Sequence, residues 1–214
     1  MSKSTVILQA ESQLGKTEYP KDSNLTPYGA AFGLNGYPWC VIFLWWCFQE
    51  AGESAAFYGG GKTGSCGQLL RWYRERGQTV GAYDAEPGDI LILNFSGNED
   101  TEHCGIVTKA FGGGRYRTIE GNTLPGEEGS QDNGGSVAQK TRYGYQVVGA
   151  IRPKYGPERM PNDWESHWAA DAIKWAIENK IMQGYPDGSF RPDQTMTRAE
   201  LATALKNFSE REEK

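Results

Sequence analysis

The stretch PWCVIFLWWCFQEAG at residues 38–52 constrains the fold more strongly than any other part of the chain. A proline begins it, a glycine ends it, and apolar residues occupy every side of the helical wheel between them. A helix that is apolar all round is stable only when other elements bury it. The stretch therefore predicts a buried helix over residues 40–50 in the core of a folded domain.

This stretch is too short to cross a membrane. Its most apolar run covers residues 39–48, whereas a bilayer requires about 20 residues. The chain of 214 residues has room for one domain with a small appendage, and its 7 Trp, 11 Tyr and 8 Phe can build a core. It also has 28 glycines, about twice the usual share of roughly 7%, so we expect many tight turns.

The charge balance argues against two classes of partner. The chain has 22 basic and 27 acidic residues, for a net charge of −5. We therefore expect neither nucleic acid nor an anionic membrane surface as a partner. Residues 1–18 lack the apolar segment and the small-residue cleavage site of a secretory signal. We expect a product that is made in the cytoplasm without a signal peptide.

Helical patterns come first along the chain, and strand patterns follow. We expect helices at residues 5–14, 40–50 and 68–77, and strands at 90–95, 103–110, 115–120 and 143–152. Glycines at 112–114 join two of these strands in a hairpin, and residues 121–135 form a long loop. This order is typical of an α+β domain with N-terminal helices and an antiparallel sheet.

A second, smaller unit follows the α+β domain. We divide the chain into a main domain at residues 1–155, a linker at 156–162, a helix–loop–helix module at 163–208 and a tail at 209–214. The module has helices at 167–179 and 198–207, and a capping box of Thr197 and Glu200 starts the second. A unit of this size buries little apolar surface, so we expect it to dock on a partner or to self-associate.

Cys40 lies in the first turn of the predicted buried helix. The positive end of the helix dipole favours a thiolate there, which makes Cys40 a candidate nucleophile, although an ordinary buried cysteine gives the same pattern. The chain has four cysteines and no CxxC spacing, so we expect no zinc knuckle. Cys66 lies in a predicted loop and Cys104 on the strand face opposite His103, and neither is assigned a role.

His103 is the only histidine of the main domain, and it begins a predicted strand. The residue numbers of two facing residues in a hairpin add up to a constant. This sum is 225 when the turn is centred between Gly112 and Gly113, and 223 when the turn centre shifts by one residue. His103 then faces Asn122 or Glu120, and these two share a face because side chains alternate along a strand. Either register places a carboxylate and an amide beside the imidazole, which is the third partner that a Cys–His pair needs.

Five blocks, GYPWC, PGDILIL, EHCGIV, TIEGNT and VVGAIRP, resemble in this order the CHAP family of cysteine- and histidine-dependent amidohydrolases and peptidases. The resemblance covers roughly residues 5–155 and implies a papain-like fold. It implies that Cys40 is the nucleophile, His103 the base and Glu120 the orienting carboxylate, with Asn122 in support. Many members cleave peptidoglycan, either at the muramoyl–L-alanine amide or within its peptides.

The resemblance implies acyl transfer without a metal or organic cofactor. The Cys40 thiolate attacks an amide carbonyl, and His103 protonates the leaving amine and then activates water against the thioester. One departure concerns the oxyanion hole, because Trp39 stands where many members have glutamine. We assign one oxyanion donor to the backbone N–H of Cys40 and a second to Asn35.

A calcium site is a further option, because some members of this family bind calcium in the corresponding early loop. Asp22 and Asn24 are the candidate ligands in this chain. Two oxygen side chains fall short of the six to eight ligands that calcium takes. Solvated loop residues are therefore the preferred interpretation.

The blocks DWESHWAADAIKWAIENKIMQGYPDGSFRP and MTRAEL resemble a single S-layer homology module. That family implies attachment to secondary polymers of Gram-positive cell walls. It makes Arg198 a candidate polymer contact, with Trp168 and Gly184 as further candidates. A core position for Trp168 and a turn for Gly184 are the alternatives. Members usually carry three modules, so self-association of the single module into a homo-oligomer is a second option.

Together these features predict a bacteriolytic cell-wall hydrolase with a wall-binding module, similar to a phage endolysin and acting on peptidoglycan after its release from the cytoplasm. Two alternatives stay open. One is a non-catalytic wall-associated protein that uses a hydrolase fold as a scaffold. The other is an amidase that acts on a small amide of the glutathione–polyamine type.

Overall fold

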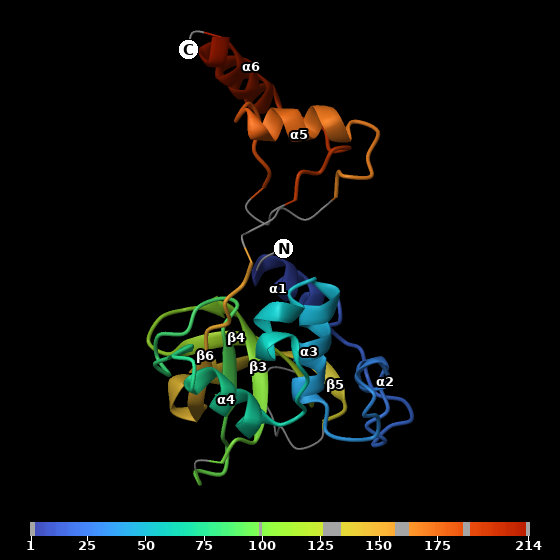
Figure 1. Cartoon of the computed structure of the whole chain (residues 1–214), viewed down its shortest axis with the longest axis vertical. Helices are drawn as coiled ribbons and strands as arrows, with labels where there is room; N and C mark the ends of the chain where they lie inside the picture. The colour runs from blue at the N-terminus through green and yellow to red at the C-terminus, as the bar shows by residue number, and fades with distance from the viewer. Residues whose placement is uncertain (1–2, 99, 126–133, 157–162, 186–188, 213–214) are drawn as a thin grey trace. The chain divides into compact units, whose positions relative to one another are not determined.

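The computed structural model describes residues 3–98, 100–125, 134–156, 163–185 and 189–212 (Figure 1). The chain separates into two compact units, Met1–Pro157 and Glu158–Lys214. The predicted linker at 156–162 lies outside the described residues except for Gly156, as do residues 126–133 of the predicted long loop. Each unit has its own secondary structure and is described by itself.

The first unit has the predicted α+β order, with helices before a sheet. Its α-helices are α1 (Lys3–Glu11), α2 (Pro27–Phe32), α3 (Cys40–Glu50) and α4 (Cys66–Arg74). Its strands are β1 (Thr79–Val80), β2 (Ile90–Leu93), β3 (His103–Ala110), β4 (Arg115–Thr123), β5 (Ser136–Tyr143) and β6 (Val147–Ile151).

The strands form one antiparallel sheet in the order β1-β6-β2-β3-β4-β5. Side chains alternate along each strand, so they point to two faces of the sheet. Buried apolar side chains lie on both faces. Helices α1, α3 and α4 pack on one face, against Ile92, Ile106 and Ile119 (Figure 1). The other face carries a smaller cluster that includes Leu91 and Val107.

Helix α3 is the central element of the larger core, as its all-apolar composition requires. Eight of its 11 residues are buried. Its first turn lies close to β4, because a Cβ added at Gly121 would come within 2.6 Å of the Cβ of Phe43. Only glycine at position 121 allows this approach, which brings Cys40 at the helix start close to the sheet.

Several elements differ from the sequence expectation. Helix α2 lies between the helices predicted at residues 5–14 and 40–50, where no helix was predicted, and Thr26 caps it by accepting a hydrogen bond from the N–H of Gly29 at 2.9 Å. Strand β4 continues to Thr123, and β5 was not predicted. The strand expected at 143–152 is the shorter β6, since residues 144–146 form a 3-10 turn.

The second unit contains α5 (Ala170–Glu178) and α6 (Arg198–Glu212). The predicted capping box is present, with the N–H of Thr197 donating to Glu200 at 2.7 Å and the N–H of Glu200 to Thr197 Oγ1 at 3.2 Å. Helix α6 runs into the predicted tail, so residues 209–212 are helical. The core position considered for Trp168 is wrong, because its side chain is 90% exposed. Within the described residues, no helix has the length and apolar character needed to cross a membrane.

Candidate active site

Cys40 is the first residue of α3 and is 8% exposed. The preceding residue, Trp39, occupies the N-cap position and makes no side-chain capping hydrogen bond. The N–H groups of the first helical turn have no acceptor within the helix, and they create a partial positive charge there. The local structure therefore favours negative charge on the Cys40 sulfur.

His103, Glu120 and Arg142 form a buried chain of hydrogen bonds across three strands. The His103 Nε2 atom lies 3.1 Å from Glu120 Oε2. Arg142 donates to both oxygens of this carboxylate, from Nε to Oε1 at 2.7 Å and from Nη2 to Oε2 at 2.6 Å. The Thr118 hydroxyl donates to Oε1 at 2.6 Å. Glu120 is fully buried, so its orientation is fixed from several sides.

The pairing of β3 with β4 explains how Glu120 reaches His103. Near His103 the strands follow the first of the two predicted registers, with Ile106 opposite Ile119, an index sum of 225. A bulge toward the turn shifts the pairing by one residue. In this register Glu120 lies opposite Gly105, and a Cβ added at Gly105 would lie 2.5 Å from Glu120 Cγ. The missing side chain at Gly105 leaves the space that Glu120 uses.

The pKa shifts favour a thiolate–imidazolium pair. Hydrogen bonds from Cys104 and Cys66 hold the pKa of Cys40 well below its usual range, with burial opposing and His103 reinforcing this effect. Burial opposes protonation of His103, but hydrogen bonds to Cys40 and Glu120, together with their charges, raise its pKa to about 9. Because Nε2 is held by Glu120, Nδ1 is the ring nitrogen left for Cys40.

The pKa of Glu120 is lowered, which keeps this side chain ionised as an orienting carboxylate requires. Burial alone would raise it, but hydrogen bonds from His103 and Arg142 and their positive charges lower it to about 2. The carboxylate is therefore ionised at neutral pH and stabilises the protonated imidazole. Arg142 was not among the predicted site residues. The alternation of 138, 140 and 142 would have indicated it only once β5 was recognised.

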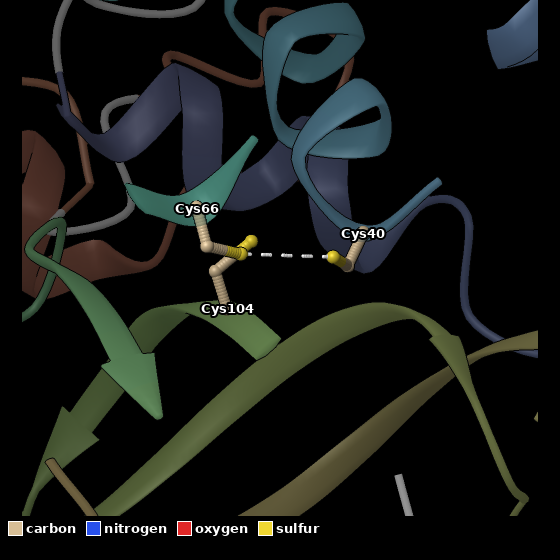
Figure 2. A group of neighbouring side chains, drawn as sticks. All are labelled: Cys40, Cys66 and Cys104. Atoms are coloured by element: carbon tan, nitrogen blue, oxygen red, sulfur yellow. Dashed lines mark hydrogen bonds between the residues drawn. The ribbon is translucent and has the colours of Figure 1, made fainter. Parts of the chain in front are cut away.

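Cys66 and Cys104, which had no predicted role, lie together on one side of Cys40 (Figure 2). The Cys40 and Cys66 Sγ atoms are 3.9 Å apart, and all three sulfurs lie within 4.8 Å of one another. Cys104 lies on the face of β3 opposite His103, as expected, and that face packs against α3. The loop predicted for Cys66 is wrong, because this residue begins α4.

Trp39, which replaces the glutamine of many family members, and Asn35, the predicted second oxyanion donor, both make side-chain hydrogen bonds. The indole N–H of the buried Trp39 donates to Glu18 Oε2 at 3.4 Å. Asn35 Oδ1 accepts a hydrogen bond from the N–H of Thr26 at 2.9 Å. This contact gives Asn35 a structural role at the start of α2, while its predicted role as an oxyanion donor, which would use the amide nitrogen, stays a prediction. The backbone N–H of Cys40 stays the predicted oxyanion donor.

Asn122 is buried and has a positive φ of 57° at an irregularity in the pairing of β4 with β5. Its Oδ1 accepts a hydrogen bond from the N–H of Gly135 at 3.3 Å. This bond fastens the chain immediately before β5, the strand that carries Arg142. The supporting catalytic role of Asn122 stays a prediction.

The early loop supplies only part of a calcium ligand set. Asp22 is exposed, and Asn24 Oδ1 and Glu18 Oε1 are buried without a hydrogen-bond partner. Such oxygens suit a cation, but two of them fall short of the six to eight ligands that calcium requires. The other oxygen of Glu18 is already committed, since it accepts from the N–H of Asn24 at 3.1 Å. The residues of this loop therefore do not form a complete calcium site.

The second unit contains a cavity of about 500 Å³, and Gly184 is among its lining residues. The Arg191 guanidinium also lines it and lies 4.2 Å from the centre of the Tyr185 ring. Arg198 and Trp168 are not part of this lining. Arg198 is an exposed residue at the start of α6, and the exposed Trp168 ring lies with its centre 5.4 Å from that of His167. The three candidate polymer contacts are therefore not gathered around this cavity.

Comparison with known families matches two parts of the chain. Residues 33–122 match the CHAP domain, and residues 162–202 match the S-layer homology domain. The first range contains Cys40, His103 and Glu120. The second range contains all of α5 and the first turn of α6. The two ranges fall in the two units of the structure.

Curated relatives match short segments of this chain. Cell surface glycoprotein 1 of Acetivibrio thermocellus is 54% identical over 44 residues, 21% of this chain and 2% of the relative. The cellulosome-anchoring protein of the same organism is 53% identical over 47 residues, 22% of this chain and 10% of the relative. Outer membrane protein SlpA of Deinococcus radiodurans is 46% identical over 39 residues, which are 18% of this chain and 3% of the relative. The chain thus spans a small part of each relative's length.

Among solved structures, the crystal structure of Ly7917 is similar to this chain with a TM-score of 0.42 and 15% identity. The similarity covers 72% of this chain and 63% of Ly7917.

Proposed function

We propose that this chain, which carries a CHAP domain followed by an S-layer homology domain, hydrolyses an amide bond of bacterial peptidoglycan. The observation that carries the proposal is the buried series of contacts from Cys40 through His103 to Glu120 at the positive end of α3. A thiol, an imidazole and an orienting carboxylate in this order are the components of a cysteine amidase or peptidase.

In the proposed reaction, the Cys40 thiolate attacks the carbonyl carbon of the amide, and the carbonyl oxygen becomes an oxyanion. The N–H groups in the first turn of α3 stabilise that negative charge. His103 gives its proton to the leaving amine, which departs and leaves a thioester on Cys40. The neutral ring then takes a proton from water, which hydrolyses the thioester and restores the thiolate–imidazolium pair.

The contact with Glu120 determines which ring nitrogen of His103 is available for the proposed reaction. The Glu120 carboxylate holds the ring through Nε2, which leaves Nδ1 as the nitrogen that exchanges protons with Cys40 and the leaving amine in this proposal. Arg142 keeps the carboxylate ionised and prevents it from rotating, because it binds both oxygens. Arg142 is therefore a positioning residue in this proposal.

We further propose that the S-layer homology domain holds the enzyme at the cell wall by binding a secondary wall polymer. The names of the Acetivibrio relatives, a surface glycoprotein and an anchoring protein, support attachment at the cell surface. They favour an enzyme that resides at the wall. Release from the cytoplasm during lysis, as for a phage endolysin, is the other form of this proposal.

Mass spectrometry of the products released from purified Gram-positive peptidoglycan tests the proposed activity. Free muramoyl lactyl groups with intact stem peptides identify an amidase. Cleaved stems or bridges that are still attached to muramic acid identify an endopeptidase. No release from several wall types would overturn the hydrolase proposal and favour the wall-binding or small-amide alternative.

Variants of two buried cysteines on α3 make this experiment specific. Cys40→Ala removes the nucleophile, and we expect product release to fall by at least about 1,000-fold. Cys47→Ala is the matched control, because Cys47 is also buried on α3 but lies outside the site. Activity that survives in Cys40→Ala, with the fold intact, would contradict the assigned nucleophile.

A further inference from the structure

Three of the four cysteines converge at one buried point, although they are far apart in the sequence. Cys40 begins α3, Cys66 begins α4, and Cys104 is the second residue of β3 (Figure 2). Their sulfurs all lie within 4.8 Å of one another, with 3.9 Å between Cys40 and Cys66. The proposed hydrolysis uses only one of these thiols. The other two have no part in it as nucleophile, base or orienting group.

The spacing of the sulfurs suits coordination of a single metal ion. Zinc–sulfur bonds are about 2.3 Å long, so sulfurs around a tetrahedral zinc ion lie about 3.8 Å apart. The Cys40–Cys66 distance is already 3.9 Å. The other pairs lie within 4.8 Å, so they need to close by no more than about 1 Å.

The positions of Cys40 and Cys66 at helix starts also suit negative charge on two of the three sulfurs, whereas burial raises the pKa of Cys104 and keeps it a thiol until a metal displaces its proton. Cys40 and Cys66 each occupy the first position of an α-helix, of 11 and 9 residues. The Ser65 side chain caps the second helix by accepting from the N–H of Gln68 at 3.3 Å. Two helix N-termini therefore direct their partial positive charges at the sulfurs. All three cysteines are buried, Cys104 completely and Cys40 and Cys66 with 8% and 7% of their surface exposed.

We propose that Cys40, Cys66 and Cys104 form a binding site for a soft divalent cation such as Zn²⁺. Soft thiolates select such metals over the hard cations that oxygen ligands prefer. Binding forms three sulfur–zinc bonds and releases the remaining thiol protons to solvent. In the described residues, no fourth Cys, His, Asp or Glu ligand atom lies within 4.8 Å of all three sulfurs. Water therefore completes the coordination.

This site couples metal availability to catalysis. A zinc ion bound to Cys40 draws electron density from the sulfur and occupies the space where the substrate carbonyl must approach, so we expect the metal-bound enzyme to be inactive until the ion leaves. This inhibition rests on the proposed function, whereas the metal site does not. In this proposal, Cys66 and Cys104 act as metal ligands, and neither residue attacks the substrate or transfers a proton.

The test measures zinc binding directly, using the full chain freed of metal and kept reduced by a reductant that does not bind zinc. Equilibrium dialysis against Zn²⁺, followed by elemental analysis, gives the stoichiometry and the affinity. We expect one ion per chain. Co²⁺ as a spectroscopic probe should give a thiolate-to-cobalt charge-transfer band. Loss of a second-shell partner weakens metal affinity by 10- to 100-fold, so we expect Cys66→Ala, which removes a ligand, to weaken it by at least about 100-fold.

Cys47→Ala is the matched control, because Cys47 is buried on α3 but is not part of the cluster. We expect this variant to bind zinc as the wild type does. Cys104→Ala provides a second ligand deletion, and circular dichroism with thermal unfolding identifies the variants that fold. No zinc bound by the wild type, or equal affinity in a folded ligand variant, would overturn the site.

The catalytic consequence is measured separately on released muropeptides. We expect stoichiometric zinc to inhibit the wild type, a chelator to restore it, and the residual activity of Cys66→Ala to resist the same zinc concentration. Zinc-saturated protein that hydrolyses at the metal-free rate would overturn the inhibition. Protein that binds zinc through these cysteines but never releases muropeptides would overturn the proposed function and leave the metal site standing.

Discussion

Cys40 and His103 are best described as a charged pair in the resting enzyme. The pKa of Cys40 is held well below its usual range and that of His103 is raised to about 9. At pH values above the lowered pKa of Cys40 and below about 9, the sulfur is negative and the ring is positive. Each charge stabilises the other in a place where burial would otherwise oppose both. In the proposed mechanism, the proton that the leaving amine needs is thus already on His103 before substrate binds.

The alkaline limit of activity follows from this arrangement. As the pH rises through about 9, His103 loses the proton that it must give to the leaving amine, so the rate of product release should fall. Toward acid the rate should persist far below that value, because the lowered pKa of Cys40 keeps the thiolate. Initial rates over a pH series check this. A fall centred near about 6.5, the ordinary histidine value, would contradict it.

Arg142 is the buried cation that balances Glu120. Its side chain is 4% exposed, and it binds both carboxylate oxygens. Removing one partner of a buried ion pair typically costs about 3–5 kcal/mol, because the other charge is left without compensation. We expect Arg142→Met to lower the free energy of unfolding toward the lower end of this range, since His103 continues to contact Glu120.

Denaturant unfolding measures that loss, and Arg115 on β4 provides a matched control. Arg115 is exposed and stacks on Phe111 at 4.6 Å, so Arg115→Met should cost less than about 1 kcal/mol. Equal losses in the two variants would show that Arg142 does not stabilise the carboxylate.

Some elements were predictable because their patterns have a single interpretation. Helix α3 begins and ends where the sequence predicts, since an apolar stretch between a proline and a glycine leaves few choices. Strand β3 also has its predicted bounds. Alternation along β3 and β4 placed Glu120 beside His103 in either register, so part of the site followed from parity alone.

Other elements were missed because their patterns contradict the usual signals. Strand β5, SVAQKTRY, buries Lys140 and Arg142, whereas strand recognition relies on buried residues being apolar. The thiol cluster was missed for a different reason. Alternation predicts which face of β3 Cys104 occupies, but not that the N-terminus of α4 also reaches that face. Such a contact depends on tertiary packing between distant segments.

Gly105 shows how one strand position determines the geometry of the site. An added Cβ would lie 2.5 Å from Glu120 Cγ, so Gly105→Ala must displace the Glu120 side chain or separate β3 from β4. We expect both a lower melting temperature and a loss of activity larger than the loss of folded protein explains. Gly64→Ala is the control, since its Cβ would meet Ile42 at an ordinary 3.8 Å.

Melting curves and rates measured on the folded fraction separate the two effects of Gly105→Ala. If the variant melts like the wild type and keeps its activity, Glu120 does not depend on the space beside Gly105.

At the scale of the whole chain, the two units differ in how well each can sustain its own fold. Both apolar clusters of the sheet and its helices lie within the first unit. The described core of the second unit is small, with Ile173, Ala176 and Ile181 buried, while Leu201 and Leu205 on α6 are 50% and 61% exposed. Small units gain little stability from apolar burial. The first unit should therefore fold alone, whereas the second gains from a partner such as a wall polymer.

Truncation to Met1–Pro157 separates the proposed chemistry from the proposed anchoring. This form retains the buried contacts of Cys40, His103 and Glu120, so its kcat/KM on soluble muropeptides should equal that of the full chain. On intact walls its rate should fall, because it lacks the module that raises its local concentration there. Sedimentation with purified walls measures binding without turnover when both forms carry Cys40→Ala. Equal sedimentation of the two forms would mean that wall attachment comes from the first unit, and the anchoring role of the second would then be lost.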